Sequence, residues 1–99
     1  MASSLAVAVG QAQTPGAANQ HATKGQEVFL QKCMQCHSIN KGQAMLGPSL
    51  WGEMTKAPHK KTAAQIRLII QNGKGKMPPW KSMLTPEQVD DLIAYIHTL

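Results

Sequence analysis

The stretch Cys33-Met34-Gln35-Cys36-His37 decides how the rest of the chain is organised. Two cysteines separated by two residues and followed directly by a histidine form the attachment motif of a c-type haem. The chemistry needs this spacing, because two thiols on one helical turn can reach the two vinyl groups of one porphyrin and form thioethers. His37 would then face the iron and supply an axial imidazole. The motif therefore predicts one covalently bound haem c per chain, attached through Cys33 and Cys36.

Other interpretations of the two cysteines fit the sequence less well. A thioredoxin-like redox motif would follow a strand of a parallel sheet, and no alternating strand pattern is present. A structural zinc site takes four Cys or His ligands, and the chain has only 2 cysteines. A chance neighbour at His37 is the remaining alternative, and the motifs further along the chain argue against it.

Length and composition indicate one small domain. With 99 residues, of which 4 % are aromatic, the chain has little material for a core, and a buried porphyrin would act as a staple. Residues 1–22 differ from the rest, since they hold a short apolar run and no amphipathic repeat. We expect them to be a disordered tail, the remnant of a secretory signal or a start introduced by cloning, outside a folded domain at residues 23–99. The apolar run is too short to cross a bilayer, so no membrane span is expected.

Three helices are predicted, each opened by a capping box in which a threonine caps the helix and a glutamine three positions later reaches back. They start at residues 23, 62 and 85; the first extends to about residue 36, and Gly73 ends the second. Four residues of the last helix recur at helical spacing and form one apolar face: Val89, Leu92, Ile93 and Ile96. The intervening segment at residues 38–45 is polar and predicted to be flexible. The predicted fold class is all-α.

The order of these motifs resembles that of a class I cytochrome c over residues 23–99. After the Cys-x-x-Cys-His come a Gly-Pro-x-Leu-x-Gly turn at residues 47–52, a middle helix, a Met-Pro-Pro-Trp loop at residues 77–80 and a last helix with an aromatic residue. The resemblance implies three main helices and loops wrapped around one covalently bound haem. It also implies that the first and last helices cross closely at four residues: Gly25, Phe29, Leu92 and Tyr95.

The same resemblance makes Met77 the second axial ligand of the iron. Independently, a thioether suits both oxidation states of iron without adding charge, and His/Met ligation raises the reduction potential. Met77 lies in a loop shaped by glycine and proline, although a methionine otherwise often fills gaps in a core. The other candidate ligands are Met34, Met45, Met54, Met83 and His59.

Three more residues are candidate contacts of the haem. In the family, the carbonyl of the proline in the Gly-Pro turn, here Pro48, accepts a hydrogen bond from the axial histidine and fixes its tautomer. Trp51 and Trp80 are candidates for packing on the porphyrin or for a hydrogen bond to a propionate, with ordinary apolar packing as the alternative. Three other histidines are expected at the surface rather than on a metal: His21, His59 and His97.

The chain is basic, with a formal charge of +5, and its 10 basic residues all lie between Lys24 and Lys81. Several lysines flank the haem motif or Met77: Lys32, Lys41, Lys74, Lys76 and Lys81. A positive rim around the haem edge would steer docking to redox partners with an acidic surface; a merely solvated basic surface is the alternative. No base-reading module accompanies the lysines, so nucleic acid is not an expected partner.

These features predict a soluble monomer that passes one electron between a donor and an acceptor protein and is not an enzyme. With both axial positions filled, none would remain for peroxide or oxygen. Two alternatives stay open: a haem-based gas-binding or sensor module, and a cytochrome subunit of a periplasmic dehydrogenase. Haem attachment of this type indicates the bacterial periplasm.

Overall fold

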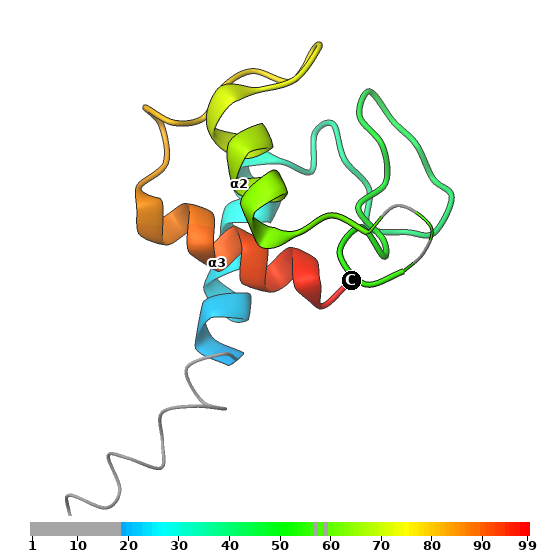
Figure 1. Cartoon of the computed structure of the whole chain (residues 1–99), viewed down its shortest axis with the longest axis horizontal. Coiled ribbons are helices and arrows are strands. Elements are labelled where there is room, and N and C mark those ends of the chain that lie inside the picture. Colours follow the sequence, from blue (N-terminus) through cyan, green and yellow to red (C-terminus); the bar gives the residue numbers. More distant parts are fainter. Residues whose placement is uncertain (1–18, 57, 59) are drawn as a thin grey trace, which may run out of the picture.

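The computed structural model describes residues 19–56, 58 and 60–99, and Figure 1 shows how they are arranged. This part of the chain contains no strand and three helices: residues 19–32, α2 (Ala63–Asn72) and α3 (Pro86–His97). The all-α prediction is therefore confirmed. Most of the predicted tail lies outside the described residues. Within them, no helix combines the length and the hydropathy needed to cross a membrane.

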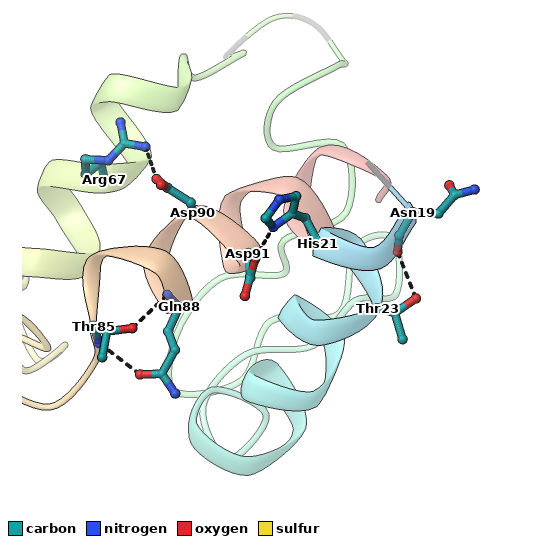
Figure 2. Close-up of polar contacts among 8 residues, drawn as sticks. All are labelled: Asn19, His21, Thr23, Arg67, Thr85, Gln88, Asp90 and Asp91. Atoms are coloured by element: carbon teal, nitrogen blue, oxygen red, sulfur yellow. Dashed lines mark hydrogen bonds and ion pairs between the residues drawn. The ribbon is translucent and has the colours of Figure 1, made fainter. Parts of the chain in front are cut away.

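The N-terminal helix, residues 19–32, starts earlier than predicted and also ends earlier. Residues 19–22 are already helical, and the Thr23 hydroxyl donates a hydrogen bond to the Asn19 carbonyl oxygen, 2.9 Å away (Figure 2). Thr23 is thus an interior residue of the helix and not the predicted cap. Its hydroxyl bonds to the preceding turn, as the hydroxyl of a threonine inside a helix can. At the other end, residues 33–36 form turns instead of continuing the helix.

Both remaining capping boxes are present as predicted. Thr62 Oγ1 accepts a hydrogen bond from the Gln65 backbone N–H at 3.1 Å, and Gln65 Oε1 accepts one from the Thr62 N–H at 2.8 Å. Thr85 and Gln88 repeat this arrangement at the start of α3 (Figure 2). Gly73 ends α2 with a φ of 79°, a left-handed conformation that favours glycine. Local sequence signals therefore define both helices.

The N-terminal helix and α3 cross at Gly25. A Cβ at this position would lie 1.9 Å from the Asp91 carbonyl oxygen, so only glycine allows the two backbones to approach this closely. Beside the crossing, the rings of Phe29 and Tyr95 pack at a tilt with their centroids 5.5 Å apart. The helix crossing that the family resemblance implied is present.

The core lies where these helices face one another. The four residues of the predicted apolar face on α3 are all at most 7 % exposed, and α2 adds two buried isoleucines: Ile66 and Ile70.

At the surface, Arg67 of α2 forms an ion pair with Asp90 of α3 (Figure 2). Asp91 is buried, and its carboxyl group is hydrogen-bonded to Nδ1 of His21 in the N-terminal helix (Figure 2). The half-exposed His21 thus has a structural partner that sequence analysis did not foresee, and an unpaired buried carboxylate would be costly.

Candidate functional site

A cavity of about 250 Å³ is lined by residues of all three helices and of the loops between them. The four residues predicted to bind the haem or its iron line this cavity together: Cys33, Cys36, His37 and Met77. Much of the remaining wall is aliphatic and comes from α2 and α3: Ile66, Ile69, Ile70, Leu92 and Ile96. Apolar walls combined with two thiols, an imidazole and a thioether fit an iron porphyrin.

The attachment motif forms a tight turn directly after the N-terminal helix. The backbone N–H groups of Cys36 and His37 both donate to the Cys33 carbonyl oxygen, at 3.1 and 3.0 Å. Burial, and after it the neighbouring Cys36, raises the pKa of the Cys33 thiol to about 11. A nucleophilic cysteine of a redox-active pair needs a lowered pKa. The environment of Cys33 therefore favours the thiol and differs from that of a thioredoxin-like motif.

The His37 ring is held by two consecutive residues of the following loop. Its Nδ1 lies 2.8 Å from the Pro48 carbonyl oxygen, which can only accept, so Nδ1 carries the proton and Nε2 keeps a lone pair for a metal. A Cβ at Gly47 would lie 2.5 Å from His37 Cε1. The Pro48 contact agrees with what the family resemblance implies. The close approach of Gly47 was not expected, and its only signal in the sequence is its place directly before Pro48.

Hydrogen bonds fix the loop that carries Pro48. The hydroxyl of the buried Ser38 donates to Gln43 Oε1 at 2.9 Å and accepts from the Asn40 N–H at 2.8 Å. The Ser49 hydroxyl donates to the Asn40 carbonyl oxygen at 2.6 Å. The polar composition of residues 38–45 predicts a flexible segment here. The structure instead shows its polar side chains bound to one another and to the turn backbone, which supports the position of the Pro48 carbonyl.

Met77 reaches the cavity from the loop that follows α2. Lys74 and Met77 exchange two backbone hydrogen bonds, of 3.1 and 2.9 Å, across a turn in which Gly75 has a φ of 60°. After Met77, the Trp80 N–H donates to the Ile70 carbonyl oxygen at 2.9 Å and ties the chain back to α2. The backbone is therefore held on both sides of Met77.

The other candidate methionines do not line the cavity. Three of them are exposed methionines, Met34, Met45 and Met83, while Met54 packs against the core. His59 lies outside the described residues. In the part of the chain that the structure describes, no three His, Cys, Asp or Glu side chains gather in a metal site of their own.

The structure separates the two tryptophans. Trp80 lines the cavity, whereas Trp51 does not. Trp51 is 38 % exposed, and the Nζ atoms of Lys41 and Lys56 lie 5.2 and 5.1 Å from the centroid of its ring, which is typical of cation–π contacts. The structure thus brings Trp80 to the predicted site and places Trp51 away from its wall, beside two lysines.

Charged side chains also line the cavity. Three exposed lysines take part: Lys32, Lys74 and Lys76. A fourth lysine, Lys61, is paired with Glu53, the one acidic residue among the residues of the cavity wall. Within the described chain, the positive charge around the cavity therefore exceeds the negative charge.

Comparisons with known proteins add to this geometry. The family model of cytochrome c oxidase, cbb3-type, subunit III matches residues 20–96. The chain is 32 % identical to cytochrome c6 of Leptolyngbya boryana over 75 residues. The aligned residues cover 76 % of this chain and 88 % of that protein. Identity to cytochrome c6 of Rippkaea orientalis is 31 %, over 84 % of this chain and 75 % of the relative.

A further relative is much longer than this chain. The cbb3-type cytochrome c oxidase subunit FixP of Bradyrhizobium diazoefficiens is 30 % identical over 79 % of this chain, which spans only 27 % of that protein. No solved structure gives a significant match.

Proposed function

The chain belongs to the class I c-type cytochromes, within the family of cbb3-type cytochrome c oxidase subunit III, and we propose that His37 and Met77 ligate the iron of its haem. It is a one-electron carrier with a single haem c, bound through Cys33 and Cys36, and not an enzyme. The haem supplies an iron that alternates between the ferric and ferrous states. The observation that carries the assignment of these four residues is that all of them line one cavity.

The surrounding residues have distinct tasks in this proposal. The Pro48 carbonyl keeps the proton of His37 on Nδ1, so Nε2 is the atom that binds the iron. Met77 offers a thioether that adds no charge and suits both oxidation states. Its loop is tied to α2, so the ligand keeps its place when the charge of the iron changes. The isoleucines of α2 give the site an apolar wall, which disfavours water there.

Covalent attachment can be tested directly. Because two thioethers should hold the haem, acidified organic solvent is expected to leave it on the wild-type protein. Extraction of the haem into the solvent would contradict attachment through Cys33 and Cys36. Replacing both cysteines by alanine should yield apoprotein or loosely bound haem.

The lysines around the cavity support a proposal about the partner. Lys32, Lys74 and Lys76 are exposed and line the cavity, and no salt bridge among the described residues involves them. Clustered charge of one sign accelerates association with a surface of the opposite sign. We infer that the redox partners present acidic surfaces and that the carrier works as a monomer.

The compartment follows from the attachment chemistry. We infer that the holoprotein resides in the bacterial periplasm, because the Cys-x-x-Cys-His motif at residues 33–37 is typical of haem attachment outside the cytoplasm. Fractionation of the native host should find the haem-loaded protein in the periplasmic fraction. Mature holoprotein in the cytoplasm would contradict the inference.

A second candidate function is that of a haem module in a larger respiratory assembly. The similarity to the oxidase subunit FixP and to its family model favours it. Gentle purification from the native host separates the two possibilities. Elution alone at the size of the 10.7 kDa chain supports the free carrier, whereas stable elution with other oxidase subunits supports the module.

A further inference from the structure

Glu53 and Lys61 form an ion pair in the wall of the haem cavity. Lys61 Nζ lies 2.5 Å from Glu53 Oε2, and the Lys61 backbone N–H donates to the Glu53 carbonyl oxygen at 2.8 Å. Both residues line the cavity together with the cysteines and the candidate axial ligands. Because a backbone hydrogen bond joins the same two residues, their geometry does not depend on the side-chain charges alone.

The position of this pair gives its charges influence inside the cavity. The Lys61 and Glu53 side chains are 29 % and 19 % exposed. Water and salt therefore screen them less than they screen the exposed lysines nearby. Among the described residues of the cavity wall only Glu53 is acidic, so with a haem bound it would be the one acidic side chain lining its site.

We propose that the Glu53–Lys61 pair balances charge at the haem, with Glu53 lowering the reduction potential and Lys61 offsetting that effect. The inference rests on the proposed function, since it needs a haem in the cavity. Reduction adds one electron, so a nearby negative charge disfavours the ferrous state and a nearby positive charge favours it. Together the two residues present almost no net charge to the iron. The potential is then governed mainly by the axial ligands and the apolar walls.

Redox titration of the purified holoprotein tests this proposal in four proteins: wild type, Glu53→Gln, Lys61→Met and the double variant. Glu53→Gln is expected to raise the potential and Lys61→Met to lower it. The double variant should lie between the two and closer to wild type than either. Because the pair is partly buried, these shifts should persist at high salt.

Matched controls remove the same charges from exposed positions that do not line the cavity: Glu87→Gln and Lys24→Met. Their shifts should be smaller and should fade as salt rises. Shifts of the Glu53 and Lys61 variants that are no larger than these, or that have the opposite sign, would overturn the proposal.

Two further measurements keep the outcome interpretable. The long-wavelength absorption band of the ferric protein reports whether Met77 still binds the iron in each variant. If a single variant loses the band, the double variant with exchanged charges, Glu53→Lys with Lys61→Glu, is titrated instead to test the proposal. A restored band with a potential near that of wild type supports the pair, and any other potential overturns it. Failure of the wild type to retain haem in acidified solvent would instead contradict the proposed function.

Discussion

The His37 imidazole owes its orientation to backbone atoms rather than to other side chains. The Pro48 carbonyl oxygen accepts a hydrogen bond from Nδ1 of His37, and the absence of a Cβ at Gly47 leaves room for the ring. Both residues belong to one loop, which Ser38 and Asn40 help to hold. The proposed axial ligand His37 thus depends on local packing that neither the cysteines nor an iron would provide.

Gly47→Ala is expected to disturb the site more than Pro48→Ala. The new Cβ would lie 2.5 Å from His37 Cε1, so the ring or the turn must move, at a cost of about 1–3 kcal/mol in the free energy of unfolding. Chemical denaturation and the haem absorption spectrum of the holoprotein measure the effect. Pro48→Ala keeps the backbone carbonyl and should leave the spectrum nearly unchanged. The reverse ranking would argue against this account of how His37 is held.

Met77→Ala is expected to abolish the weak long-wavelength charge-transfer band of the ferric protein and to lower its reduction potential. The thioether would no longer favour the ferrous state, and the sixth coordination position would open to CO in the reduced protein. Absorption spectroscopy with and without CO, together with a redox titration, measures both effects.

The control for this variant is Met83→Ala. Met83 is 60 % exposed and does not line the cavity, so the band and the potential should stay close to those of wild type. A band that survives in Met77→Ala and disappears in Met83→Ala would show that the ligand assignment is wrong. A wild-type protein that lacks the band and binds CO freely would favour the gas-binding alternative.

The three helices differ in what determines their limits. α2 and α3 each begin at their own capping box, and a glycine ends α2. The N-terminal helix instead continues through Thr23, and its close contact with α3 depends on Gly25. Its place in the fold is therefore set by packing between elements more than by signals within its own sequence.

Gly25→Ala is expected to weaken the crossing of the N-terminal helix with α3. The added Cβ would meet the Asp91 carbonyl oxygen at 1.9 Å, and backbone cannot yield as a flexible side chain does. We expect a loss of about 3 kcal/mol or more in the free energy of unfolding, measured by denaturation of the holoprotein. Thr23→Ala, an exposed change on the same helix, should cost about 0.5 kcal/mol or less. Equal effects of the two changes would contradict the close approach.

At the scale of the whole molecule, charge and the cavity coincide. Exposed lysines from the N-terminal helix and from the Met77 loop line the same cavity, although they are far apart in the sequence. Of the acidic residues of α3, Asp90 and Asp91 are paired with Arg67 and His21. This arrangement leaves positive charge around the cavity for a partner to meet.

Electron transfer to an acidic partner is expected to slow as salt rises, because exposed charges are screened over about 8 Å at physiological ionic strength. Lys74→Glu and Lys76→Glu should lower the association rate more than Lys24→Glu, which changes an exposed lysine that does not line the cavity. Stopped-flow kinetics at several salt concentrations measure this. Rates that do not depend on salt would leave the lysines with a role in solubility alone.

The sequence by itself determined the features that depend on short-range chemistry. The spacing of Cys33, Cys36 and His37 indicates haem attachment, and the capping boxes at Thr62 and Thr85 define α2 and α3, because each involves groups within a few residues of one another. Periodicity likewise identified the buried face of α3. The same local pattern misled at Thr23, since a threonine followed by a glutamine three positions later also occurs inside a helix.

Only the tertiary structure decided which distant residues meet. It placed Trp51 beside two lysines instead of at the cavity, and it brought Glu53 and Lys61 into the cavity wall. It also paired His21 with Asp91, residues at opposite ends of the folded chain. Such contacts depend on how loops close and helices cross. Loop conformations and helix crossings are determined by packing over the whole chain, and no local pattern of residues encodes them.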